Sequence, residues 1–274
     1  YLMIYFFFRA GLKDIGEKQS SSRTLEQIDT SKLGLRLNEI ERSGSFFYLG
    51  GLAAVHATER SRDGIWNALK NKHTYATSGH RMLLWFNANK NDQTSVSMGG
   101  KLKTKEAPEF HVTAIGSPKQ KEGCPDYIKQ AFTQAKLNKM AFGECYYPTD
   151  NRYKIERLEV IRIRPQSYEG EPVAGLIEDP WKQHTCLEDS DVCEFTFTDD
   201  DYTSDQRDVL YYVRAIEEPI MIINANTSRN EYDEDGNVIK VNICSGDYKT
   251  SESDDCLGKK GHQAVSSPIF TYYQ

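Results

Sequence analysis

Residues 50–86 read GGLAAVHATERSRDGIWNALKNKHTYATSGHRMLLWF, and this stretch decides the fold that the sequence predicts. Leu52 to Ala57 form an apolar run typical of a buried strand. Thr74 to Thr77 are strand formers that end at Ser-Gly, where a turn is expected, and a further β run follows. This order of elements is strand, helix, strand and then a further β run. It is the order expected where the last unit of an α/β barrel is followed by a β domain.

The segment between these two strands is predicted to be a helix. Ser61 precedes it as a candidate N-cap, because its hydroxyl can accept a hydrogen bond from a free backbone N–H. Ile65, Trp66 and Leu69 fall at i, i+1 and i+4 and give the helix one apolar face. We expect this face to pack on the strand 52–57, because only that arrangement buries both apolar surfaces.

After residue 80 the sequence alternates between short apolar runs and turn-rich connections, which indicates a β-sandwich. The run 155–164 changes phase between Val160 and Ile161, as a β-bulge would require. The run 209–216 is apolar on both faces and is therefore expected at the centre of a sheet. Other strands are expected at 81–88, 110–115, 237–243 and 267–272, and helices at 25–42 and 126–140.

Composition and charge exclude several classes of protein. The chain has 274 residues, 38% hydrophobic and 27% charged, so it can form a core and is not of the disordered class. A formal net charge of −6 argues against a general nucleic-acid-binding protein, which would present a basic face to phosphates. No apolar run reaches the roughly 20 residues that span a bilayer. The start, YLMIYFFF, lacks the basic leader and the cleavage site of a signal peptide.

The cysteines predict an oxidising environment. All six follow residue 120, and no Cys-x-x-Cys occurs, which argues against a zinc knuckle. They form three sequence-local pairs in polar, loop-like regions, so we predict disulfides and a periplasmic or extracellular location. The predicted pairs are Cys124–Cys145, Cys186–Cys193 and Cys244–Cys256, although spacing alone does not fix the connectivity.

Motifs spread over the chain carry a resemblance to a known family. They include GLAAVHA at 51–57, HTYATSGHRMLLWF at 73–86, GSPKQKEGCPD at 116–126, GECYYPTD at 143–150 and SSPIF at 266–270. With these residues the chain resembles the domain-of-unknown-function 3604 family. That family is similar to carbaryl-hydrolase-like metallohydrolases and, more distantly, to the polymerase and histidinol phosphatase (PHP) superfamily. The resemblance implies an α+β fold, in which residues 1–80 are the C-terminal part of a PHP-like α/β barrel and residues 81–274 a mainly antiparallel β-sandwich.

The resemblance also implies a cofactor. PHP-type enzymes bind divalent metal ions (zinc, manganese or iron) with an early His-x-His, scattered His and Glu ligands and a late Asp-x-His. This sequence contains neither motif, and its six histidines are isolated from one another. We therefore expect the chain to be the C-terminal part of a longer enzyme whose metal site lies mostly on the missing N-terminal part. By itself, this part is expected to bind no catalytic metal and to be inactive.

His56 and Glu59 lie at the end of the first apolar strand, where an α/β barrel places its active site. As functional residues they would be catalytic acid/base groups lining the pocket, or His56 an auxiliary ligand. As structural residues they would be a loop histidine and a solvated carboxylate, with Glu59 paired to Arg60.

The turn at 77–81, TSGHR, is the best remaining candidate for a substrate-binding site. Thr77, Ser78 and Gly79 can offer hydroxyl and backbone N–H groups to an anionic substrate, and Arg81 can offer a bidentate positive charge. The alternative is a tight connection between two domains, in which Gly79 serves for its backbone freedom.

Other polar features are interpreted as structural. His73 and His80 are taken as surface histidines, and the run Asp199 to Asp201 as a solvated loop. The segment YDEDGNVIKV at 232–241 resembles the acidic start of a calcium loop but lacks the third ligand spacing and the distal Glu, so a hairpin turn is predicted at Asp235-Gly236.

Two functions of different class follow. The first is hydrolysis of a small-molecule ester or phosphoester by a metal-bound water, with the metals stabilising the developing negative charge. The second is a non-catalytic β-sandwich module of an exported protein, which binds a glycan, a lipid or a partner protein. Neither function includes nucleic-acid binding or a membrane span.

Overall fold

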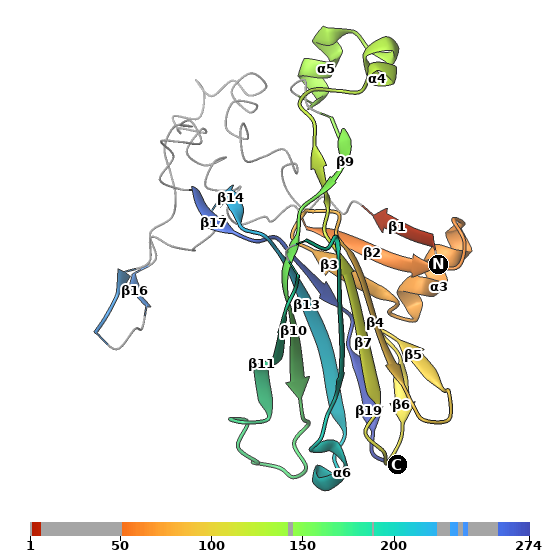
Figure 1. Cartoon of the computed structure of the whole chain (residues 1–274), viewed down its shortest axis with the longest axis vertical. Coiled ribbons are helices and arrows are strands. Elements are labelled where there is room, and N and C mark those ends of the chain that lie inside the picture. The colour runs from red at the N-terminus through yellow and green to blue at the C-terminus, as the bar shows by residue number, and fades with distance from the viewer. Residues whose placement is uncertain are drawn as a thin grey trace, which may run out of the picture. The chain divides into compact units, whose positions relative to one another are not determined.

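The structure is a computed structural model, drawn in Figure 1. Its residues form two compact units. The first unit comprises Tyr1–Phe7, Leu52–Glu218 and Gln263–Gln274, and the second comprises Phe8–Gly51 and Pro219–His262. The residues that the structure describes are 2–6, 51–141, 145–187, 189–223, 231–234, 238–240 and 257–274.

A nine-stranded sheet forms one layer of the first unit, in the order β1-β2-β3-β18-β13-β10-β11 with β19 and β6 attached through β13. Every ladder in it is antiparallel except that between β19 and β6. Its strands are β1 (Leu2–Phe6), β2 (Leu52–Ala57), β3 (Thr74–Thr77), β6 (Lys101–Lys103), β10 (Ile155–Ile163), β11 (Ile177–Thr185), β13 (Val209–Glu217), β18 (Gln263–Ser266) and β19 (Ile269–Tyr272).

The second layer is a four-stranded sheet in the order β12-β7-β4-β5, with all pairings antiparallel. The predicted mainly antiparallel β structure is therefore confirmed. A short helix, α6 (Tyr202–Asp205), connects the two layers between β12 and β13. The strands of this layer are β4 (Leu83–Asn89), β5 (Ser95–Ser97), β7 (Glu109–Ile115) and β12 (Val192–Thr198).

The strand–helix–strand unit at 52–77 has a different geometry from that of a barrel. β2 and β3 are hydrogen-bonded neighbours and run antiparallel, with Leu52 opposite Thr77, whereas α/β barrels are built from parallel strands. β3 then pairs with β18 from the end of the chain. Strands from both sides of the predicted boundary at residue 80 thus share one sheet, and the described residues show no barrel closure.

The helix α3 (Arg62–Lys70) begins as predicted but packs on a different face. Ser61 caps it, its Oγ accepting from the Gly64 N–H at 3.0 Å. The buried positions are Gly64 and Ala68, and Ala68 packs with Val55 and Ala57 of β2. Small residues one turn apart let the helix approach the strand closely, which the larger side chains would prevent.

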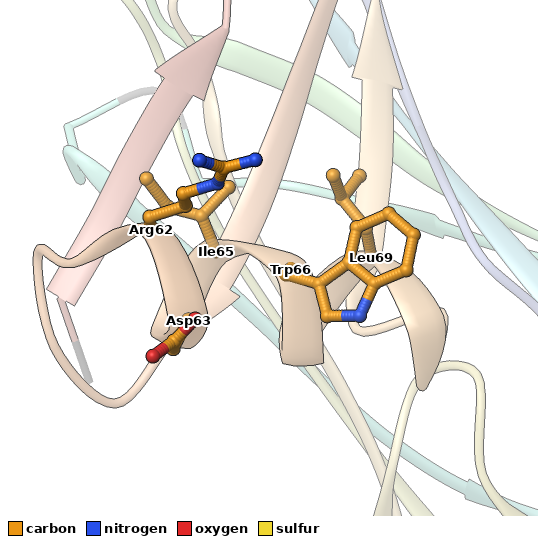
Figure 2. Close-up of a pocket in the computed structure, with 5 residues that line it drawn as sticks. All are labelled: Arg62, Asp63, Ile65, Trp66 and Leu69. Atoms are coloured by element: carbon orange, nitrogen blue, oxygen red, sulfur yellow. The ribbon is translucent and has the colours of Figure 1, made fainter.

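The predicted packing of α3 through its large apolar residues is therefore wrong. Trp66 is 64% exposed and Leu69 is 39% exposed. With Ile65, Arg62 and Asp63 they line a hollow on the outer side of the helix (Figure 2).

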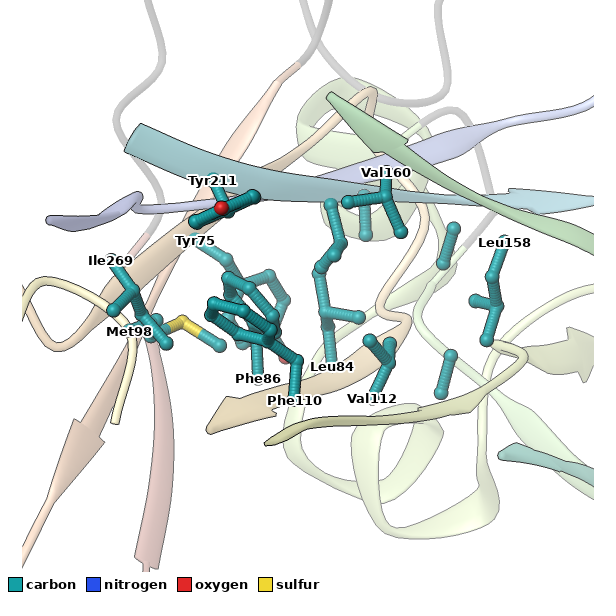
Figure 3. Close-up of a cluster of buried hydrophobic side chains, with 14 of the residues drawn as sticks. Tyr75, Leu84, Phe86, Met98, Phe110, Val112, Leu158, Val160, Tyr211 and Ile269 are labelled. Atoms are coloured by element: carbon teal, nitrogen blue, oxygen red, sulfur yellow. The ribbon is translucent and has the colours of Figure 1, made fainter. Parts of the chain in front are cut away.

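The main hydrophobic core lies between the two layers of the sandwich (Figure 3). Aromatic rings form its centre: Phe110 of β7 stacks on Phe197 of β12 at 4.9 Å and contacts Tyr211 of β13 at 4.5 Å. Alternate residues of β4 and β7 are buried, as a strand with one face on the core requires.

Two details predicted for individual strands are confirmed. The β10–β11 ladder shifts register between Val160 and Arg162, where the hydrophobic phase changes. β13 lies centrally, because it pairs with β10 on one side and with β18 and β19 on the other.

A hairpin extends from the end of the sandwich and carries two short helices in its connection (Figure 1). The predicted single helix at 126–140 is two helices, because Phe132 has extended backbone angles (φ −137°, ψ 142°). Cys124–Cys145 forms a disulfide that closes this connection, as predicted. We call residues 118–152 the arm; it consists of β8 (Pro118–Gln120), α4 (Asp126–Ala131), α5 (Gln134–Ala141) and β9 (Pro148–Arg152).

The second predicted disulfide, Cys186–Cys193, is also present, but its surroundings differ from the prediction. Cys193 lies in β12 rather than in a loop, and both cysteines belong to the main core cluster. The third predicted pair, Cys244–Cys256, lies outside the described residues.

Two separate ladders are described in the second unit. β14 (Ile220–Ile223) pairs with β17 (Leu257–Lys260), and β15 (Glu231–Tyr232) pairs with β16 (Val238–Lys240), both antiparallel. The β15–β16 ladder flanks the predicted Asp235-Gly236 turn, which itself lies outside the described residues, as does the helix predicted at 25–42.

Candidate functional site

His56 lies within β2 and is buried, with 9% of its surface exposed. Its Nε2 is 2.9 Å from the Leu84 carbonyl oxygen, so the neutral ring donates to the backbone of β4. Burial lowers the pKa of His56 below its ordinary value of 6.5. The ring is also packed against Tyr75 and Trp85. These contacts give His56 a structural position between the two sheets.

Glu59 is exposed and has a different partner. It accepts a short hydrogen bond from the hydroxyl of Ser61, the residue that caps α3. The structure thus gives the two predicted acid/base residues separate environments, one buried and one on the surface.

The turn 77–81 is fixed to the end of β18. Ser78 donates its N–H to the Gln263 carbonyl at 2.9 Å and accepts the Gln263 N–H on Oγ at 3.0 Å. The buried Thr77 hydroxyl accepts from the Gly79 N–H at 3.3 Å. Gly79 has a φ of 120°, which residues with a side chain rarely adopt. The hydroxyls of Thr77 and Ser78 therefore order this turn.

Arg81 is partly exposed and contacts an aromatic ring of the arm. Its guanidinium carbon lies 3.6 Å from the centroid of the Tyr146 ring, a cation–π contact, and that tyrosine is 46% exposed. The guanidinium is thus held against a ring of the arm that follows Cys145 in the sequence.

His80 is anchored rather than a free surface histidine, which corrects the prediction. Its Nδ1 lies 2.6 Å from Oε2 of Glu217, a carboxylate at the end of β13 with only 1% of its side chain exposed. The Ser117 hydroxyl lies 3.0 Å from the same nitrogen. The Ser117 N–H donates to the other carboxylate oxygen of Glu217 at 2.5 Å. We call His80, Ser117 and Glu217 the histidine–glutamate cluster.

Gly116 explains how β7 reaches this cluster. A Cβ at this position would lie 1.8 Å from the Tyr153 carbonyl oxygen, so only glycine allows the two backbones to pass. The Tyr153 N–H in turn donates to the Ser117 carbonyl at 2.9 Å. This approach brings the N–H and the hydroxyl of Ser117 to the end of β13.

Aromatic and basic groups surround the histidine–glutamate cluster. The His80 ring stacks on Tyr153 with centroids 5.0 Å apart. The ammonium of Lys119 lies 5.0 Å from the centroid of the Tyr153 ring and 3.0 Å from Oε1 of Glu218. His80 thus has one ring face on a tyrosine and its Nδ1 on a buried carboxylate.

A second charge cluster is buried around Arg162 of β10. Arg162 donates to Asp199 at 2.8 Å and to Glu178 at 2.6 and 3.1 Å, and its guanidinium lies over Trp181 at 4.4 Å. The Tyr211 hydroxyl donates to the other Asp199 oxygen at 2.5 Å. Burial and the adjacent Asp199 raise the pKa of Tyr211.

This cluster corrects the interpretation of Asp199 as a residue of a solvated loop, whereas Asp200 and Asp201 are exposed as expected. Asp199 is 1% exposed, because it neutralises the buried Arg162 and accepts from Tyr211. Since each of these groups is matched by a partner, we assign the cluster a structural role.

Three features of the described residues bear on the expected metal cofactor and on the expected location. Among them, no three His, Cys, Asp or Glu side chains come together as a metal site requires. The two disulfides fit a periplasmic or extracellular location. No described helix has both the length and the apolar content needed to cross a membrane.

Comparison with known proteins gives one match. Residues 10–122 match the family described as "Protein of unknown function (DUF3604)", which supports the family that the motifs resemble. The matched range includes β2, α3, β3, the 77–81 turn and β4. No curated protein and no solved structure matches the chain.

Proposed function

We propose that the protein hydrolyses a small-molecule ester or phosphoester, and that the turn at 77–81 contacts the substrate. The observation that carries the proposal is the neighbourhood of two side chains in that turn. His80 is held by the buried Glu217, and the next residue in the turn, Arg81, stacks its guanidinium on Tyr146. A histidine positioned by a carboxylate can move protons, and an arginine can offset the negative charge of a reacting anion.

A resemblance to PHP-type metallohydrolases, which the sequence motifs suggest, would favour the same reaction class and would imply divalent metal ions. The described residues do not fit such a group, since they include no cluster of three candidate ligands. We therefore place no metal on them. In this proposal any metal would be bound by residues outside the described ranges.

The test uses protein expressed from the complete reading frame that contains this chain. Wild type is assayed on p-nitrophenyl acetate and p-nitrophenyl phosphate, with and without added zinc, manganese or iron. Arg81→Ala is expected to lower turnover by about tenfold or more, with little change in melting temperature, whereas Arg81→Lys retains part of the activity. Wild type that hydrolyses neither probe under any of these conditions would contradict the proposal.

The alternative function, a binding module of an exported protein, is favoured by the arm. Tyr127 is 68% exposed and Tyr146 46% exposed, and the Cys124–Cys145 disulfide holds the connection between them. Exposed tyrosines on a constrained hairpin are common at protein and glycan interfaces. The test measures binding of the protein to glycans on an array. Binding by the wild type that is lost in Tyr127→Ser, together with an absence of hydrolytic activity, would favour this alternative.

A further inference from the structure

The histidine–glutamate cluster combines a serine, a histidine and a glutamate, which are the residue types of a hydrolytic triad. In such a triad the acid and the serine contact different ring nitrogens. Here both Glu217 Oε2 and Ser117 Oγ contact Nδ1 of His80, at 2.6 and 3.0 Å. Ser117 is 3% exposed and thus inaccessible to a substrate. The cluster is therefore not a serine-nucleophile site.

His80 is the most exposed member of the cluster. Its side chain is 23% exposed, compared with 1% for the side chain of Glu217. Chemistry at this cluster must then involve the imidazole. Glu217 and Ser117 hold the ring, together with the stacked Tyr153.

The partners of Nδ1 fix the position of the proton. The short contact between Nδ1 and Oε2 of Glu217 contains one proton, and we assign it to Nδ1, so that both carboxylate oxygens act as acceptors. Oε1 of the same carboxylate already accepts the Ser117 N–H. In the neutral ring, Nε2 then carries the lone pair and is the basic nitrogen.

We propose that His80 is the general base of the hydrolytic site, that Glu217 and Ser117 are its positioning residues, and that Arg81 stabilises the substrate's negative charge. This inference rests on the proposed function. Water oxygen attacks the carbonyl carbon or the phosphorus while Nε2 takes a water proton. The bond to the leaving oxygen then breaks with its electron pair, and His80 returns the proton to that oxygen. One ester and one water give one acid and one alcohol.

The first experiment measures the tautomer without any substrate. Long-range ¹H–¹⁵N correlation spectra of histidine-labelled protein from the complete reading frame distinguish protonated from unprotonated ring nitrogens. We expect neutral His80 to have its proton on Nδ1, and Glu217→Gln to shift the ring towards the other tautomer. A wild-type ring with its proton on Nε2 would overturn the inference even in an active enzyme.

The second experiment measures hydrolysis of the two p-nitrophenyl probes. His80→Gln is expected to lower turnover by about 100-fold or more and to abolish the fall in rate on the acidic limb of the pH profile, where a general base becomes protonated. Glu217→Gln should lower turnover less and displace the pH profile, which a purely structural role would not do. His184→Gln, on β11 and stacked on Phe195, is the matched control and should retain wild-type activity.

The outcomes separate the two proposals. An inactive wild type contradicts the proposed function, and with it a catalytic role for His80. An active wild type in which His80→Gln, folded by circular dichroism, keeps full turnover contradicts the inference alone. If Glu217→Gln does not fold, the tautomer of His80 in the wild type and the turnover of His80→Gln still test the inference.

Discussion

At the scale of single residues, burial gives His56 an effect on stability that depends on pH. Its pKa in the folded protein is lowered by desolvation, so the unfolded chain binds more protons below the ordinary value of 6.5. The stabilisation is therefore complete above that value and is lost as the pH falls towards the folded pKa. We expect the melting temperature of the wild type to fall between about pH 7.5 and 5.

His56→Gln tests this directly, because the glutamine amide can still donate to the Leu84 carbonyl but does not titrate. The melting temperature of the variant, measured by circular dichroism, should fall less than that of the wild type over the same pH range. Equal losses in the two proteins would show that other groups cause the acid sensitivity.

Gly116 is the residue at which a single methyl group should have the largest effect. Its Cβ would lie 1.8 Å from the Tyr153 carbonyl, a backbone atom that cannot rotate away. We expect Gly116→Ala to lower the unfolding free energy by about 3 kcal/mol in urea titrations. Gly123→Ala is the control: it has a positive φ of 77° but no atom within 4 Å, so its cost should be near 1 kcal/mol, about that of the backbone alone.

At the scale of elements, α3 shows why residue size decides which face of a helix is buried. Ala68 packs against Val55 and Ala57, whereas Trp66 is mostly exposed. We expect Ala68→Leu to cost about 1–3 kcal/mol through overpacking, and Trp66→Ser to change stability by less than about 0.5 kcal/mol. Chemical denaturation of both variants checks this, and a large loss in Trp66→Ser would mean that the outer face is covered in solution.

The strands were more predictable than their partners. Alternation of apolar residues located β7 and β10, and the phase change at Val160 located the bulge, because these signals are local. The antiparallel pairing of β2 with β3, and of β3 with β18, depends on contacts between distant parts of the chain. Short-range patterns in a sequence do not show which strands pair or in which direction. The sequence of 52–77 therefore could not distinguish the expected barrel geometry from the antiparallel pairing that is observed.

The candidate site was predictable in part for the same reason. The turn at 77–81 was found from its residue types, but the partners of His80 come from positions 117 and 217. One signal for Glu217 was present: Val209, Tyr211, Val213 and Ala215 are buried, and period-two alternation continues this inward face to Glu217. A carboxylate on the buried face of a central strand requires a donor, and the sequence alone did not identify which.

At the scale of the whole molecule, the two disulfides should act on different parts. Loop entropy alone predicts that Cys124–Cys145, with a sequence separation of 21, contributes more to the unfolding free energy than Cys186–Cys193, with a separation of 7. The difference is about 1 kcal/mol if both disulfides act on the same unfolding transition. Burial favours the opposite order. Cys186 and Cys193 are part of the main core cluster, whereas Cys124–Cys145 closes the arm, whose helix α4 has no buried residue.

We expect the core location to decide the result, because opening the arm need not open the sandwich. Cys186→Ser with Cys193→Ser should lower the global unfolding free energy by about 2 kcal/mol or more. Cys124→Ser with Cys145→Ser should leave it nearly unchanged but speed amide hydrogen exchange in α4 and α5. Mass-spectrometric exchange and urea unfolding measure the two effects. If the arm variant lowered global stability more than the core variant, the arm and the sandwich would unfold as one cooperative unit, and loop entropy would outweigh burial.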